Sequence, residues 1–206
     1  MARRGSYAKG VAKREEILER SLDVIAREGY RGASVKELAD AVGLSQAGLL
    51  HYFDSKEELF TEILRKRDEV DARAYGGSSE VVSPDGLRDG FVGVIRHNAD
   101  VPGLVQLYSR MAVDAADTSH PAHRYFVDRN SALRASFADG LRALQAEGRL
   151  TDVVDAETLA RIVQAVADGL QLQWMQDPST DMAGTVEAMF RALDPSVPAG
   201  DPKETS

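Results

Sequence analysis

The segment from Ser34 to Phe53 carries the residue pattern with the clearest chemical use. Ser34 and Glu37 have the spacing of a capping box, in which a hydroxyl and a carboxylate cap the start of a helix. Gly43 permits the positive φ that a tight turn demands, and Ser45 can cap a second short helix. Helices joined by such a turn cross at roughly 90–120°, so the second helix can enter the major groove of DNA.

The start of this second helix suits contact with DNA. Its first residues, Ser45-Gln46-Ala47-Gly48, are small or polar, so a DNA backbone can approach closely. Gln46 could hydrogen-bond to the edge of an adenine or to a phosphate. The plain alternative is an ordinary helical hairpin. Two short helices, a glycine turn and small residues together favour the helix-turn-helix.

The elements that must position these residues are all predicted to be helices, which gives an all-α fold. Apolar residues recur at helical spacing, and glycine and proline separate helix-length segments. Gly29 and Gly148 are expected to end helices. The expected helices are 11–28, 34–42, 45–53, 55–73, 84–97, 101–115, 121–147, 155–176 and 180–193.

Charge is distributed unevenly along the chain. The net charge is −8, but residues 1–56 hold ten Lys and Arg against eight Asp and Glu, which leaves −10 for the rest. Five of these cations lie in the first 14 residues, before any acid. A basic N-terminal arm on an acidic body could attract phosphate to one end. The alternative is a solvated, disordered tail.

Composition excludes several classes of protein. Cysteine is absent, which excludes disulfides, thiol catalysis and cysteine-bound metals. His97, His120 and His123 are too scattered to predict a metal site, and no cofactor is expected. No apolar run reaches the roughly 20 residues of a membrane span, and no apolar run follows Arg3 and Arg4 as in a signal peptide. We therefore expect a cytoplasmic protein without membrane contact.

Residues 12–64 resemble the DNA-binding domain of the TetR family of repressors. The resemblance rests on the run Ala26-Arg-Glu-Gly29-Tyr30, on Ser34-Val-Lys-Glu-Leu-Ala39 and on Gly43-Leu-Ser45 through His51-Tyr52-Phe53 to Lys56 and Phe60. It implies three DNA-binding helices and a fourth that leads into a helical ligand-binding and dimerisation domain. The expected segments are a DNA-binding domain over 1–55 with its basic arm, a helical domain over 56–193 and a disordered tail over 194–206.

The resemblance also implies roles for individual residues of the first domain. Leu50 departs from the family, which often has a phosphate-binding tyrosine there, so this contact is lost or becomes an apolar contact with a thymine methyl. Tyr52 could instead be core, Phe53 is expected to be core, and His51 and Lys56 could simply be exposed. The expected DNA-binding residues are Lys36, Ser45, Gln46, Ala47, Gly48, Leu50, His51, Tyr52 and Lys56.

The helical remainder is expected to bind a small-molecule effector and to form a homodimer. The candidate pocket residues could equally be ordinary core, and the candidate interface residues could pack only within one chain. The candidate pocket residues are Phe91, Ile95, Leu104, Tyr108, Met111, Phe126, Asn130, Phe137 and Trp174. The candidate dimer residues are Val163, Val166, Leu170, Met189, Phe190 and Leu193.

Three kinds of function can be set against these features. The favoured one is a non-enzymatic regulator, most simply a repressor, that binds a palindrome in double-stranded DNA as a dimer and is released by a ligand. A helical carrier or interaction module would use the helix-turn-helix only as a scaffold. A hydrolase would use His97 or His123, but no nucleophile elbow, phosphate loop or carboxylate pair supports it.

Overall fold

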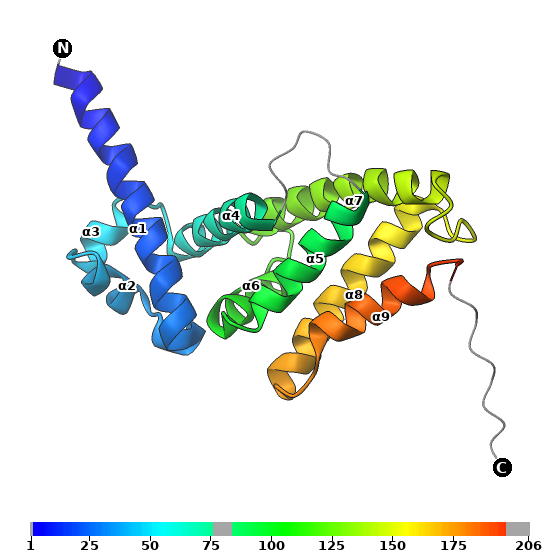
Figure 1. The fold of residues 1–206 in the computed structure, drawn as a ribbon. Helices are drawn as coiled ribbons and strands as arrows, with labels where there is room; N and C mark the ends of the chain where they lie inside the picture. The colour runs from blue at the N-terminus through cyan, green and yellow to red at the C-terminus, as the bar shows by residue number, and fades with distance from the viewer. Residues whose placement is uncertain (1, 76–83, 197–206) are drawn as a thin grey trace. The chain divides into compact units, whose positions relative to one another are not determined.

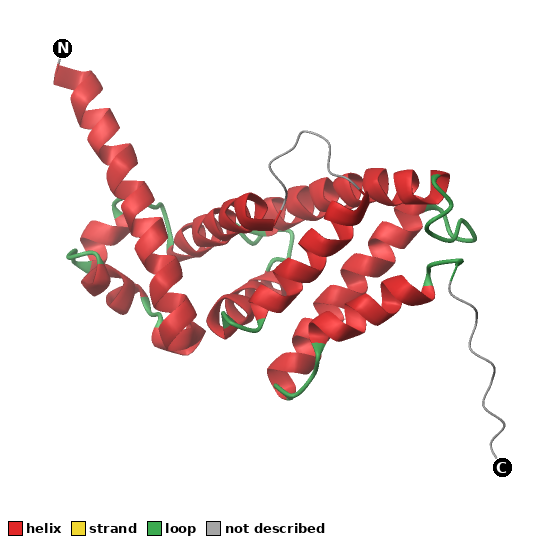
Figure 2. Ribbon diagram, viewed as in Figure 1, coloured by secondary structure: helices red, strands yellow, loops and turns green. Residues whose placement is uncertain are grey.

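The computed structural model describes residues 2–75 and 84–196, and these two ranges contain helices and connecting loops but no strand (Figures 1 and 2). The all-α fold expected from the sequence is confirmed. In chain order the helices of these ranges are α1 (Ala2–Gly32), α2 (Val35–Ala41), α3 (Gln46–Leu50), α4 (Lys56–Tyr75), α5 (Pro84–Asn98), α6 (Pro102–Asp114), α7 (His123–Ala146), α8 (Ala156–Gln176) and α9 (Met182–Ala192).

Helix α1 is longer than the sequence predicts. It begins at Ala2 instead of near Val11, so the backbone of the basic arm is helical. The arm lacks an apolar stripe, which is why periodicity did not reveal this extension. Its other end agrees better with expectation, because Gly29 has φ 76° and ψ 165°, which interrupts the regular helix.

The remaining helices begin and end close to their expected positions, because capping side chains and glycines with positive φ set their ends. The Asp155 side chain accepts a hydrogen bond from the Thr158 backbone N–H at 2.9 Å and so caps α8. Gly148 has φ 70° and ends α7. Its N–H donates to the Gln145 carbonyl, and that of Arg149 donates to the Leu144 carbonyl, both at 3.0 Å. This pair of bonds is a Schellman motif. Ser83, the residue before α5, lies outside the described residues.

The chain divides into two compact units, and the first comprises residues 1–74 and 97–128. Its core joins α1–α4 to α6 and to the start of α7. Gly103 on α6 sits against α1, where an added Cβ would lie 2.7 Å from the Gly29 Cα and closer still to the Ile25 carbonyl oxygen. The most deeply buried side chains of this core include Ile17, Ile25, Leu38, Leu49, Phe53, Leu59, Ile63, Leu64 and Leu107.

The second unit comprises residues 75–96 and 129–206, which include most of α5 and α7 together with α8 and α9. Phe91 on α5 contacts the ring of Phe137 on α7, with centroids 4.8 Å apart, and the ring of Phe190 on α9 at 6.5 Å. The expected segments 1–55, 56–193 and 194–206 stay predictions. In the tail, Asp194 accepts a hydrogen bond from the Ser196 N–H at 2.9 Å, and residues 197–206 lie outside the described part.

Candidate nucleic-acid interface

Helix α2 and the turn after it have the geometry of a helix-turn-helix. The Ser34 N–H donates to the Glu37 carboxylate at 2.7 Å, and the Glu37 N–H donates to the Ser34 hydroxyl at 3.4 Å, which confirms the capping box. Hydrogen bonding of the Glu37 carboxylate to the side chain and the backbone N–H of Ser34 lowers the pKa of this carboxyl. Gly43 has φ 68°. The Leu44 N–H reaches the Ala39 carbonyl at 2.9 Å and closes the turn in a second Schellman motif.

Helix α3 presents the expected contact residues around one buried anchor. The Ser45 hydroxyl caps it by accepting from the Gly48 N–H at 3.0 Å. Leu49 is fully buried and fixes the face of α3 that points into the core, whereas Gln46, Ala47 and His51 are exposed. The remaining expected positions are exposed or half-buried, and these are Lys36, Ser45, Gly48, Leu50, Tyr52 and Lys56.

The loop from α3 to α4 sets the position of Lys56. Ser55 caps α4 by accepting from the Glu58 N–H at 3.0 Å. Ser55 and Glu58 also have the spacing of a capping box, in which the Glu58 carboxylate would accept from the Ser55 N–H. This carboxylate instead accepts from the Asp54 N–H at 2.6 Å. The Lys56 ammonium remains exposed and lies 5.5 Å from the centre of the Phe60 ring.

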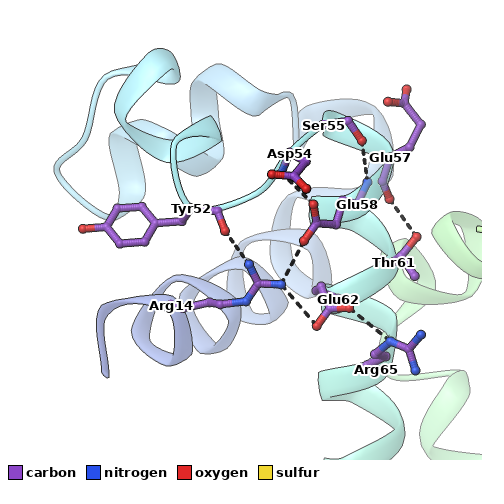
Figure 3. A network of polar contacts seen from close by, with 9 residues as sticks. All are labelled: Arg14, Tyr52, Asp54, Ser55, Glu57, Glu58, Thr61, Glu62 and Arg65. Carbon is purple, nitrogen blue, oxygen red and sulfur yellow. Dashed lines mark hydrogen bonds and ion pairs between the residues drawn. The ribbon is translucent and has the colours of Figure 1, made fainter. Parts of the chain in front are cut away.

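Arg14, on α1, connects the end of α3 to α4 (Figure 3). Its guanidinium donates to the backbone carbonyl of Tyr52, pairs with Glu58 at 3.1 Å and with Glu62 at 3.5 Å. It also stacks 4.3 Å above the centre of the Phe53 ring. One half-buried cation therefore fixes the end of α3 and the start of α4 against α1.

Two further lysines hold α1 to its neighbours. Lys13 donates to the Val42 carbonyl at 3.3 Å, beside the turn of the helix-turn-helix. The buried Lys66 of α4 donates to Glu15 at 2.6 Å. The hydrogen bond that Lys66 donates to Glu15 raises the pKa of the Lys66 ammonium despite its burial. Neither these lysines nor Arg14 were singled out as site residues, because their partners are 29 or more positions away in sequence.

The candidate pocket residues fall in both compact units. Tyr108 and Phe126 contact each other in the first, with ring centroids 5.5 Å apart, and Leu104 and Met111 are buried in the same core. In the second, Ile95 and Trp174 are buried and Asn130 is half-buried. The second unit also holds a cavity of about 320 Å³, whose lining includes none of the nine candidates. The assignment of these residues to a pocket stays a prediction.

The sequence of this chain matches known proteins, in the α1–α4 region and over most of its length. Residues 17–63 match the family model of the bacterial regulatory proteins, tetR family. The HTH-type transcriptional repressor AcnR of Corynebacterium glutamicum is 30% identical over 175 residues, which cover 84% of this chain and 87% of that protein. The chain belongs to the TetR family. The HTH-type transcriptional repressor KstR2 of Mycobacterium tuberculosis is 29% identical over 163 residues, covering 74% of this chain and 76% of the relative.

Solved structures agree with the helical fold of this TetR-family protein. A TetR-family regulator from Agrobacterium tumefaciens superposes with a TM-score of 0.71 at 22% identity, covering 90% of this chain and 99% of the other. A TetR regulator from Haloarcula marismortui has the same TM-score at 21% identity, with 89% and 97% covered.

The family decides between the functions weighed from the sequence. The protein is a DNA-binding transcriptional regulator, and the TetR family's regulators are not enzymes, which excludes the hydrolase. Within the described residues no helix is long and apolar enough to cross a membrane. Across the same residues, His, Asp and Glu side chains form no group of three that could hold a metal ion.

Proposed function

We propose that this protein is a dimeric repressor that binds a palindromic operator and is released from it by a small-molecule effector. The observation that supports DNA reading is the exposure of Gln46 and Ala47 on α3 and of His51 at its C-cap, while the buried Leu49 anchors the other face of the helix. Repression is proposed because the relatives AcnR and KstR2 are repressors. Access to DNA in a bacterium would place the protein in the cytoplasm.

Dimerisation is proposed to use the exposed stripe of α8. Ile162 is 43% exposed and Leu172 is 48% exposed, and the half-buried Val166 and Gly169 lie between them at helical spacing. Exposed apolar residues on one helix face favour burial against a partner. A second copy would pair α8 and α9 across a two-fold axis as a four-helix bundle.

The residues first expected at this interface divide into two groups. Val163, Leu170 and Phe190 are already buried within one chain, so they would support the interface from behind. Val166, Met189 and Leu193 are half-buried and can add contact area. We therefore propose that Ile162 and Leu172 make the central contacts, and that Leu172→Glu would convert the dimer to a monomer in sedimentation experiments.

Release by an effector requires a change in the separation of the two recognition helices, which occupy major grooves one helical turn or a multiple apart. Helix α4 is proposed to carry this change. It is joined to α1 through Arg14 and Lys66, and its Arg67 donates to the Leu104 carbonyl of α6 at 3.3 Å. A coupling free energy of about 1–3 kcal/mol would change operator affinity 5–150-fold.

The experiment that tests this function is selection of random DNA duplexes by the purified full chain. An enriched palindrome, whose affinity falls steeply with salt as counterions are released, would support a dimeric operator-binding protein. Enrichment of single half-sites would contradict the dimer. If nothing is enriched at any salt concentration, the operator model fails and the helix-turn-helix acts as a scaffold.

A further inference from the structure

A strip of polar side chains lies between α7 and α8 in the second unit. The Gln164 amide on α8 donates to the Asn130 side-chain oxygen on α7 at 2.9 Å. Arg134, one turn after Asn130, donates to the Gln164 side-chain oxygen at 3.4 Å. All three side chains are half-buried. Only Asn130 was among the candidate pocket residues, because the other two are polar groups that sequence alone assigns to the surface.

Gln171 extends this strip along α8, and its side-chain oxygen lacks a hydrogen-bond partner among the described residues. It is only 7% exposed, and its side-chain oxygen is buried with no donor within reach among the described residues. Seven residues separate Gln164 from Gln171, which places both on nearly the same face of the helix about 10 Å apart along its axis. Buried polar groups are almost always paired, so an orphaned amide calls for a partner that arrives from outside the chain.

Arg134 lacks a counter-ion as well. Its one hydrogen bond is the long contact to a neutral amide, and no carboxylate lies within ion-pair distance in the described part of the chain. A partly buried guanidinium is ordinarily paired with a negative group. Its planar fork matches a carboxylate, to which it can donate two parallel hydrogen bonds.

We propose that Arg134, Gln164 and Gln171 bind the effector, and that the effector is a small carboxylate that also carries a hydroxyl or amide group. The inference rests on the proposed function. The carboxylate pairs with Arg134 beside Gln164. The hydroxyl or amide hydrogen of the ligand donates to the orphaned oxygen of Gln171. The two positions are about 10 Å apart along α8, so the ligand must carry its hydroxyl or amide group roughly that far from its carboxylate.

The first test needs no ligand. Gln171→Met keeps an unbranched side chain of similar length and removes the orphaned amide. Its melting temperature is expected to rise by about 2–5 °C, because an unpaired buried amide destabilises the fold when no ligand is bound. Arg161→Gln, at an exposed position of α8, is the control and should leave the melting temperature unchanged. A lower melting temperature for Gln171→Met would show that the amide is paired within the chain and would overturn the proposal.

The second test uses the full chain and hydroxycarboxylates of about six to ten carbons, a length that matches the separation of about 10 Å along α8. In each acid the hydroxyl lies at the end opposite the carboxylate, and each is tested beside its neutral amide analogue. At least one acid is expected to raise the melting temperature of the protein and to release it from the selected DNA. The affinity for the matching amide should be at least tenfold lower. Arg134→Gln and Gln171→Met should each lower the affinity for that acid at least tenfold, while Arg161→Gln should leave the affinity unchanged. Equal binding by Arg134→Gln, or no acid that shifts the wild type, would overturn the proposal.

The two tests separate this inference from the proposed function. If the wild type selects a palindrome but binds none of the acids, the carboxylate site is wrong and the operator function stands. If the wild type binds an acid through Arg134 but selects no DNA, the site stands as a binding site and the repressor function fails.

Discussion

At the scale of single residues, the two kinds of DNA contact expected from α3 and α4 can be told apart by measurement. Gln46 and Lys56 are both exposed, and we propose that Gln46 reads a base whereas Lys56 supplies a charge to the phosphates. Gln46→Ala is expected to lower affinity for the selected duplex about 5–150-fold, corresponding to about 1–3 kcal/mol, and to relax specificity at one position. Lys56→Ala should lower the affinity for all duplexes alike. It should also reduce by about 1 the slope of log affinity against log salt concentration.

Fluorescence anisotropy at several salt concentrations measures both effects. Arg124→Ala is the control, because this side chain is 84% exposed on α7 and pairs with Asp128. A Gln46→Ala variant that weakens every duplex equally would show that Gln46 contacts phosphate. An unchanged salt slope for Lys56→Ala would remove that lysine from the interface.

Arg14 has a structural role that a lysine cannot fully replace. It donates to the Tyr52 carbonyl, pairs with Glu58 and Glu62, and stacks on Phe53. Arg14→Met is expected to lower the free energy of unfolding by about 1–2 kcal/mol, since charge-assisted hydrogen bonds and a ring contact are lost together. Urea denaturation of the wild type, Arg14→Met and Arg14→Lys measures this free energy. The stability of the lysine variant should lie between those of the other two proteins. Equal stability of all three proteins would mean that solvent screens the network.

At the scale of elements, the close approach of α6 to α1 depends on the absence of a side chain at Gly103. An added Cβ would meet the Ile25 carbonyl oxygen and the Gly29 Cα, so Gly103→Ala must push the two helices apart. The expected cost is about 1–3 kcal/mol of unfolding free energy. Gly10→Ala is the matched control, because nothing lies within 4 Å of an added Cβ there, and it should stabilise α1 by up to about 1 kcal/mol.

Thermal and urea unfolding of Gly103→Ala and Gly10→Ala measure these changes in unfolding free energy. Opposite signs would support backbone contact between α1 and α6 as the limit on residue size at Gly103. Stabilisation by both alanines would show that α6 has room to accept a Cβ.

Helix boundaries could be predicted from the sequence because their signals are local. Ser34, Ser45 and Asp155 cap helices through bonds to the residue three positions ahead, and Gly43 and Gly148 end helices through their own φ. The core assignment of Phe53 was predicted equally well, and it is 2% exposed.

The parts that could not be predicted depend on contacts between distant segments. Arg14 meets Tyr52 and Glu58 across 38 and 44 positions, and no local pattern marks such a meeting. The orphaned amide of Gln171 is also invisible in sequence, because lack of a partner is a property of the surrounding fold. Val163 and Leu170 show the same limit, since a helical stripe does not reveal whether it packs within one chain or between two.

At the scale of the whole molecule, stability should fall at both extremes of pH for reasons that the structure identifies. Hydrogen bonds from the Thr158 backbone lower the pKa of the Asp155 carboxyl, as those from Ser34 do for Glu37. A carboxyl with a lowered pKa stabilises the fold above its unfolded pKa of about 4, and this stabilisation is lost as the pH falls through the folded value. The hydrogen bond to Glu15 raises the pKa of Lys66, so its contribution is present below about pH 10 and is lost as the pH rises further.

Urea midpoints measured between pH 3 and pH 11 should therefore be level from about pH 5 to pH 9 and fall on either side. Asp155→Asn keeps a capping group without a charge, so its acid decline should be shallower than that of the wild type. Lys66→Met should remove part of the alkaline decline, because no ammonium remains to be neutralised beside Glu15. A wild type and Asp155→Asn with parallel acid declines would show that the α8 cap contributes equally in both protonation states, contrary to the lowered pKa.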